Sequence, residues 1–236
     1  MKASQLFRVL LAILLLAAGP ARALTKDDPV IPFVNLDRLE VHDADEGRPL
    51  VWKGSAGLSG DLWGLHLTSE GERLDGVTEE GEIQVRVRRA LSAFWNLELG
   101  WRRDFMPKPA RDWAALGLEG VLPYHIETEL SVYGNEDGDT AARLEAHHEL
   151  RFTQRLVLRS AVELDAYGQD DLRRGLGSGL AHLEAGVRLG YEVRRKITPY
   201  LGVEYKRVYD DTADLHRAAG EPLHDTVVVG GLRLWY

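Results

Sequence analysis

Histidine and glutamate side chains recur along this sequence at the polar positions of segments that alternate between apolar and polar residues, where they could bind a metal ion. The residues in question are His66, His125, His147, His182, Glu70, Glu127, Glu145 and Glu184. Imidazole nitrogen and carboxylate oxygen suit borderline divalent metals such as Cu(II). The same residue types also form structural networks, in which Glu, Arg and His pair to fill a narrow interior. The pattern therefore predicts either a divalent-cation site or an internal ion-pair network.

The segments that carry these residues alternate strictly between apolar and polar positions. In one of them, Ile83, Val85 and Val87 alternate with Gln84 and Arg86. A period of two indicates β-strands with one apolar and one polar face. Twelve strands are expected, with ten as the alternative, at 34–42, 50–59, 62–72, 78–90, 94–105, 112–122, 124–134, 140–150, 155–167, 180–193, 199–209 and 226–236.

A soluble sandwich and a membrane barrel both produce this alternation, and the connections favour the barrel. Tight turns such as Gly60-Asp61 and Pro123 alternate with longer connections such as 168–179 and 210–225. Outer-membrane barrels have short periplasmic turns and longer outer loops. We therefore expect an all-β fold, a transmembrane antiparallel up-and-down β-barrel over residues 34–236, with both termini in the periplasm.

Aromatic residues fall near the ends of the expected strands. They are Trp52, Trp63, Trp95, Trp101, Trp113, Tyr124, Tyr191 and Trp235. Interfacial aromatic girdles occupy such positions in membrane barrels, although an ordinary sheet core is the alternative.

The sequence leaves the structure of two segments undecided. Phe33 to His42 is either the first strand or a plug, and Gly175 to Gly179 is either a loop or the bent start of a strand.

The first residues have the pattern of a cleaved secretory signal peptide. Basic Lys2 and Arg8 precede an apolar run that ends near Ala18, and Ala21-Arg22-Ala23 supplies small residues for cleavage. We expect a signal peptide at 1–23, a short periplasmic lead-in at 24–33, and export to the cell outer membrane, where the barrel contacts lipid.

Charge and cysteine content narrow the functional classes. Of 29 basic and 37 acidic residues, the signal peptide contains three basic and no acidic ones, which leaves a net charge of −11. This charge disfavours nucleic acid as a partner and suits cations. No cysteine is present, so no disulfide or thiolate ligand is available.

The sequence does not predict an enzyme. Ser131 shares a strand face with His125, but six positions along a strand are about 20 Å, too far for a nucleophile and its base. Polar groups in the connections, such as Asp210, Asp211 and His216, are interpreted as solvated or as an outer cation funnel. His42, beside Asp43, is interpreted as part of a polar loop cluster.

Short motifs along the chain match one bacterial family and occur in the family's order. They are Glu70-Gly71-Glu72-Arg73, Trp101-Arg102-Arg103-Asp104-Phe105, Arg111-Asp112-Trp113-Ala114-Ala115, Arg143-Leu144-Glu145, Thr153-Gln154-Arg155-Leu156, Tyr167-Gly168-Gln169-Asp170-Asp171, Leu183-Glu184-Ala185-Gly186 and Asp210-Asp211-Thr212-Ala213-Asp214. Over about residues 34 to 236 the chain resembles the outer-membrane copper-resistance protein B family. The resemblance implies a barrel in copper homeostasis that binds copper ions transiently and works beside a periplasmic multicopper oxidase.

The chain departs from this family in one respect that affects the mechanism. Members commonly carry a Met- and His-rich N-terminal extension, whereas here Met106 is the one methionine after the signal peptide and residues 24–33 contain neither Met nor His. Copper contacts are therefore expected from His, Glu and Asp of the barrel. The competing hypothesis is a closed scaffold that docks a periplasmic copper protein and is plugged by inward arginines: Arg86, Arg88, Arg102, Arg143 and Arg188.

Overall fold

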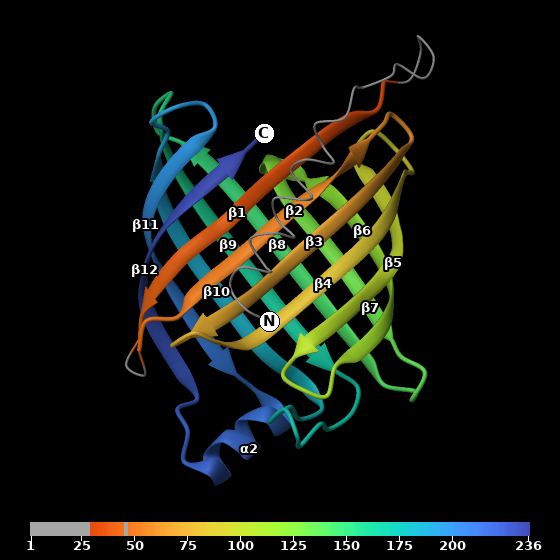
Figure 1. Cartoon of the computed structure of the whole chain (residues 1–236), viewed down its shortest axis with the longest axis vertical. Coiled ribbons are helices and arrows are strands. Elements are labelled where there is room, and N and C mark those ends of the chain that lie inside the picture. Colours follow the sequence, from red (N-terminus) through yellow and green to blue (C-terminus); the bar gives the residue numbers. More distant parts are fainter. Residues whose placement is uncertain (1–28, 45–46) are drawn as a thin grey trace.

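The computed structural model describes residues 29–44 and 47–236, and this part of the chain forms a closed antiparallel barrel of twelve strands (Figure 1). Each strand pairs with its neighbours in sequence, and the first strand closes the barrel against the last. The strands are β1 Ile31–Asp43, β2 Leu50–Ser59, β3 Trp63–Leu74, β4 Val77–Ala90, β5 Trp95–Met106, β6 Arg111–Leu122, β7 Ile126–Gly134, β8 Thr140–Arg151, β9 Leu156–Tyr167, β10 Gly179–Tyr191, β11 Ile197–Val208 and β12 His224–Trp235.

The predicted fold class is confirmed, with twelve strands rather than ten. Phe33 to His42 belongs to β1 and is not a plug, and residues 175–178 form a loop that precedes β10. The expected signal peptide, and residues 24–28 of the expected lead-in, lie outside the described residues. Residues 31–33 of that lead-in are already strand.

One helix was not expected from the sequence. The connection 210–225 was interpreted as loop, but it contains helix α2, Asp210–Ala219. Acidic Asp210 and Asp211 stand in its first turn, where they complement the helix dipole. Gly220 adopts the left-handed conformation at its C-terminus, with φ of 75°, and so ends the helix.

The barrel has two unlike ends. The terminal end has the short turns of residues 60–62, 91–94, 123–125, 152–155 and 192–196, together with the C-terminus, which lies at the top of Figure 1. The loop end has the connections 44–49, 75–76, 107–110, 135–139, 168–178 and 209–223, and α2 lies there at the bottom of the view.

Among the described residues, no helix is long and apolar enough to cross a membrane.

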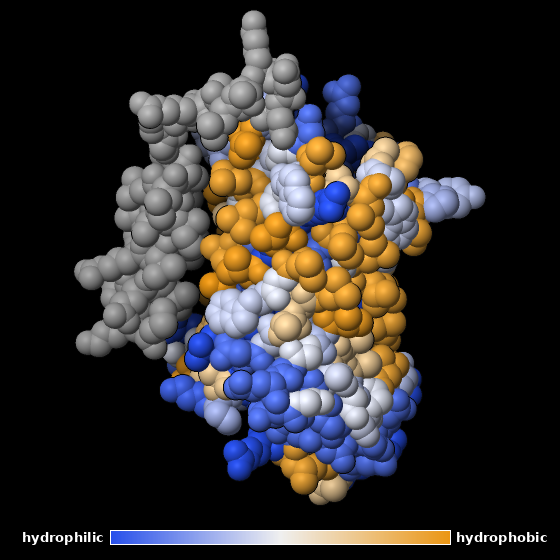
Figure 2. Space-filling model, turned by 90° about the vertical axis from the view of Figure 1, so that its right-hand side faces the viewer, coloured by the Kyte–Doolittle hydropathy of each residue, from blue (hydrophilic) through white to orange (hydrophobic). Residues whose placement is uncertain are grey.

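Apolar side chains face outward and charged side chains face the interior, which we call the lumen. Leu99 and Val203 are exposed, whereas Arg86, Glu98 and Glu204 are buried. Figure 2 shows hydrophobic side chains over the upper and middle part of the barrel wall and hydrophilic ones gathered toward the loop end. This distribution is the reverse of that in a water-soluble protein and is typical of a barrel surrounded by lipid.

The aromatic residues divide between the two faces. Trp63 and Trp235 are exposed at strand ends, as expected for an interfacial girdle, whereas Trp101 is exposed in the middle of β5. Trp113 does not belong to the girdle, because it is only 2% exposed and its indole nitrogen donates a hydrogen bond to Asp104 Oδ2 at 2.9 Å. The alternation of β6 places it on the same inward face as Ala115, which is also buried.

Candidate metal-binding site

The terminal half of the lumen contains a cavity of about 730 Å³. Seven of the eight predicted metal residues line it: His66, Glu70, His125, Glu127, Glu145, His147 and Glu184. The lining residues include twelve carboxylates and seven Lys or Arg side chains, which leaves an excess of five negative charges. The cavity therefore attracts cations. Three of the four predicted histidines line it, His66, His125 and His147, together with His148, which was not predicted.

His182 is the predicted residue that the structure separates from the others. It lies near the loop end of β10, opposite Asp165 of β9 and Val208 of β11, and it does not line the cavity. The alternation of apolar and polar residues predicted that His182 faces inward, but its height along the barrel depends on the register between strands. His182 therefore belongs to the opposite half of the lumen from His125 and His147.

The best exposed donors lie where β7 and β8 reach the terminal end. His147 Nε2 is 3.3 Å from Glu145 Oε2, and its side chain is 49% exposed. Glu127 stands directly opposite His147 in the β7–β8 register and is exposed, with no ion-pair or hydrogen-bond partner among the described residues. His125, two residues earlier, is exposed on the turn. These residues form the mouth cluster: His125, Glu127, Glu145 and His147.

His66 lies deeper in the cavity wall and has an unused nitrogen. Its Nδ1 is 3.9 Å from Glu98 Oε1, and the edge of the Phe33 ring packs against it with ring centroids 5.0 Å apart. Its Nε2 is buried and has no hydrogen-bond partner within the described part of the chain. A buried imidazole nitrogen without a partner is a free metal donor, but His66 lies on β3, four strands from β7 and five from β8, and so apart from the mouth cluster.

Ion pairs join opposite walls of the barrel at the cavity. The Lys53 ammonium on β2 lies 2.9 Å from Glu70 Oε2 on β3 and 2.7 Å from Glu145 Oε2 on β8. Strands β2 and β8 are six places apart in the closed order of twelve, so this contact crosses the lumen. Arg143 on β8 likewise reaches Glu70 and Glu82 on the far wall, as well as Glu163 beside it.

Each of the five arginines that were expected to plug the lumen is paired with carboxylates. Arg86 pairs with Glu98 and Glu129, Arg88 with Glu119, Arg102 with Glu82 and Asp104, Arg143 with Glu70, Glu82, Glu163 and Asp165, and Arg188 with Glu40 and Glu204. Such pairs neutralise the acids and oppose the passage of a cation. A salt-bridge network therefore crosses the lumen, and Arg86, Arg88 and Arg188 of this network also line the cavity.

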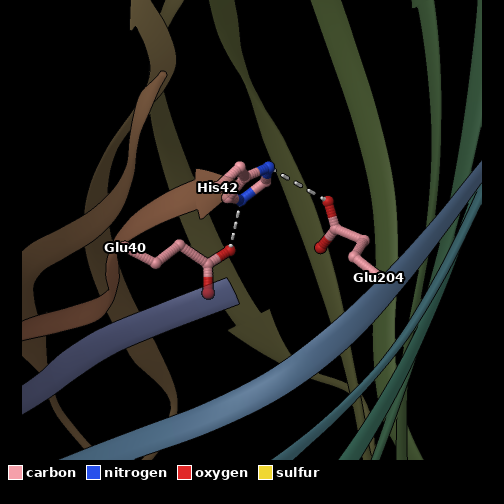
Figure 3. Close-up of side chains that lie close together, drawn as sticks. All are labelled: Glu40, His42 and Glu204. Carbon is pink, nitrogen blue, oxygen red and sulfur yellow. Dashed lines mark hydrogen bonds and ion pairs between the residues drawn. The ribbon is translucent and has the colours of Figure 1, made fainter. Parts of the chain in front are cut away.

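Sequence reasoning missed one buried group of potential ligands near the loop end, formed by Glu40, His42 and Glu204 (Figure 3). His42 Nε2 is 3.0 Å from Glu40 Oε1, and His42 Nδ1 is 4.0 Å from Glu204 Oε1. Glu40 and His42 have the i, i+2 spacing of one strand face, so the strand predicted at 34–42 could have indicated this pair. Glu204, on β11, joins them because β1, β12 and β11 are neighbours.

The charges of this group are already compensated by nearby cations. Arg188 donates to both carboxylate oxygens of Glu40, at 2.9 and 2.7 Å, and also contacts Glu204. Arg38 and Lys206 each lie 3.7 Å from an oxygen of Glu204. A divalent cation here would lie among three fixed positive charges, so the group is a structural network.

The serine considered as a nucleophile has a different partner. Ser131, 1% exposed, donates a hydrogen bond to Glu129 Oε1 at 2.9 Å. His125 lies at the far end of β7, on the turn. The structure does not bring these two side chains together as a nucleophile and its base.

A family model described as copper resistance protein B precursor (CopB) matches residues 30–236. The chain belongs to the copper resistance protein B family. A copper resistance protein B homolog from Pseudomonas syringae pv. tomato is 41% identical over 210 residues, which cover 89% of this chain and 71% of the homolog. Copper resistance protein B of Escherichia coli is 38% identical over the same shares.

The barrel of this CopB-family chain also resembles a solved outer-membrane porin. The NanC porin superposes with a TM-score of 0.56, at 14% sequence identity, over 85% of this chain and 98% of that one. At such low identity the likeness concerns the fold alone. It agrees with the closed barrel.

Proposed function

We propose that this barrel binds Cu(II) in the cavity at its terminal end and so assists copper homeostasis at the outer membrane. The observation that carries the proposal is the mouth cluster, in which Glu127 and the His147–Glu145 pair open into a cavity with an excess of carboxylates. In outer-membrane barrels the short turns face the periplasm. The cavity would therefore receive copper from the periplasm.

The donor atoms favour Cu(II) over Cu(I). Carboxylate oxygen and imidazole nitrogen supply the candidate metal contacts of the cavity, and its lining contains no methionine. Met106 ends β5 at the loop end. Soft thioether and thiolate ligands select Cu(I), whereas imidazole and carboxylate suit Cu(II). Copper is thus the cargo of the site, held through His125, Glu127, Glu145 and His147.

A closed scaffold is the second candidate function, and the salt-bridge network favours it over a permanently open channel. Lys53 and Arg143 connect opposite walls and stand in the path of copper from the cavity to the loop end, which supports a scaffold. A scaffold that holds copper at its periplasmic mouth could pass it to a docked protein. A multicopper oxidase of the copper-resistance system is the partner we propose there.

A titration of the refolded barrel with Cu(II) tests copper binding. Replacing the mouth cluster with His125→Ala, Glu127→Gln and His147→Ala together should weaken Cu(II) binding at least tenfold, because two imidazoles and one carboxylate are removed. His182→Ala is the matched control, since that histidine faces the lumen but does not line the cavity. The Cu(II) affinity of this variant should equal that of the wild type. Equal affinity of the triple variant and the wild type would refute the proposed site.

Liposome flux separates the two candidate functions. Copper uptake by proteoliposomes that exceeds uptake by empty liposomes would identify a conduit. Binding without flux would favour the scaffold.

A further inference from the structure

The ammonium group of Lys53 occupies the position of a bound cation inside the cavity. It lies between two carboxylates from different walls, 2.9 Å from Glu70 Oε2 and 2.7 Å from Glu145 Oε2. The side chain is only 17% exposed, and its partners are 14% and 11% exposed. All three residues line the cavity, so this cation is within reach of an ion that enters from the terminal end.

A pair of Cu(II) ligands stands beside this ammonium. Glu145 Oε2, the oxygen that Lys53 contacts, is also 3.3 Å from His147 Nε2. Glu70 Oε2 is buried and forms no hydrogen bond with the described residues, so only its ionic contact with Lys53 satisfies it. Imidazole and two carboxylates are thus arranged around a position that the chain fills with its own positive charge.

The charge of the surrounding network leaves room for an ion of higher charge. The carboxylates held by Lys53 and Arg143 number five: Glu70, Glu82, Glu145, Glu163 and Asp165. Four Lys or Arg side chains contact them: Arg38, Lys53, Arg102 and Arg143. Carboxylates outnumber these cations, since Arg102 also pairs with Asp104 and Arg38 with Glu204, so the position of the ammonium favours an ion of higher charge.

Lys53 is also the member of this network that can leave most easily. A lysine holds its partners through a compact ammonium on a flexible four-carbon stem, whereas the planar guanidinium of Arg143 has several donors in fixed directions. The cavity borders Lys53 and can accept its displaced side chain.

We propose that Lys53 is a tethered cation that closes the lumen and that Cu(II) displaces it from Glu70, Glu145 and the adjacent His147. This inference rests on the proposed copper binding and adds how that binding controls the opening of the lumen. When the ammonium leaves, the ion pair that joins β2 to β8 across the lumen is lost. Part of the salt-bridge network that obstructs the lumen then opens. Copper would then open its own path, while monovalent ions, which gain less from the two carboxylates, would not.

The test compares Lys53→Met with wild type and with Lys206→Met, a second inward lysine that contacts Glu72, Glu184 and Glu204 but does not line the cavity. We expect Lys53→Met to bind Cu(II) at least tenfold more tightly and to conduct K⁺ in planar bilayers without copper. Wild type should conduct only after Cu(II) is added, and Lys206→Met should behave as wild type. Lys53→Gln serves as a second variant if the methionine variant does not fold.

The outcomes distinguish the two proposals. If wild type binds Cu(II) but Lys53→Met and Lys53→Gln match it in affinity and K⁺ conductance, the tethered cation is refuted and copper binding stands. If neither wild type nor the Lys53 variants bind Cu(II), the proposed function fails, and the exchange fails with it. Nitrogen hyperfine splitting in the Cu(II) electron paramagnetic resonance spectrum of Lys53→Met that loses the coupling of one nitrogen in Lys53→Met/His147→Ala would identify His147 as a ligand.

Discussion

The guanidinium of Arg188 on β10 donates two hydrogen bonds to the carboxylate of Glu40 on β1, from Nε at 2.9 Å and Nη2 at 2.7 Å. The strands lie in the order β10, β11, β12, β1, so this contact passes across β11, β12 and the seam that closes the barrel. The lack of a side chain at Gly231 of β12 makes room for Glu40, because a Cβ at that position would lie 2.7 Å from Glu40 Cβ. The contact connects the first strand to the last quarter of the chain.

Arg188→Met should destabilise the barrel strongly. The change leaves the carboxylates of Glu40 and Glu204, both at most 2% exposed, without their main cation. Loss of one partner of a buried ion pair costs about 3–5 kcal/mol. The urea midpoint, measured by the shift in gel mobility between folded and unfolded barrel, should fall. The double variant Arg188→Met/Glu40→Gln should recover part of the loss, and a midpoint equal to that of wild type in the single variant would contradict this role.

The connection 168–178 is held at the loop end by a second group of charges, which predicts a pH dependence. Burial raises the pKa of Asp171, but the hydrogen bond from Arg174 and the charge of Arg111 outweigh it, so the pKa lies below its ordinary value. A carboxyl with a lowered pKa stabilises the folded state above its unfolded pKa of about 3.9, and this contribution is lost as the pH falls through the folded pKa.

Pepsin cleavage within 168–178 should therefore stay slow down to about pH 4 and become fast only below it. Asp171→Asn should show fast cleavage already at pH 4, because it removes the charge that Arg111 and Arg174 hold. Asp137→Asn, in the exposed connection 135–139, is the control and should resemble wild type. Equal cleavage of all three proteins at pH 4 would show that Asp171 does not secure the loop.

The choice of metal leads to a prediction about oxidation state. Glu127→Met places a thioether opposite His147 in the cavity mouth, where the natural chain has a carboxylate. Cu(II) affinity should fall, and affinity for Ag(I), a stable substitute for Cu(I), should rise, because soft ligands favour the monovalent ion. Titration of both ions into Glu127→Met and into a Glu127→Gln control separates the thioether effect from the loss of charge. Equal Ag(I) affinity in both variants would argue against a metal at this mouth.

The strands could be predicted because alternation is a local property of the sequence. The twelve expected segments match β1 to β12 to within about three residues at each end. Helix α2 could not be found in this way, because its polar sequence lacks an apolar stripe that distinguishes it from a loop. Trp113 was assigned to the girdle by its place near a strand end, but its inward parity decides its environment.

The site could be predicted only in part, because contacts across the lumen depend on closure and register. The alternation of polar and apolar residues correctly placed Glu127, Glu145 and His147 on the inner face of the barrel, where they line the cavity, since they face the same side of neighbouring strands. It could not place Lys53 against Glu145, which lies 92 residues away on the opposite wall. Nor could it place Glu204 near His42, because that contact requires β1 to close against β12.

Gly177 connects the loop 168–178 to α2 and provides a last test of the loop end. Its nitrogen donates to Thr212 Oγ1 at 2.9 Å, and a Cβ at Gly177 would lie 2.4 Å from the backbone of Asp211 and Thr212. Gly177→Val should therefore push α2 away and make the connection 209–223 sensitive to trypsin at Arg217. Ser178→Ala, which removes only the hydroxyl contact with Asp211, should change this cleavage little. Cu(II) affinity should stay unchanged in both variants, because the cavity lies at the terminal end, and a tenfold loss would place copper at the loop end instead.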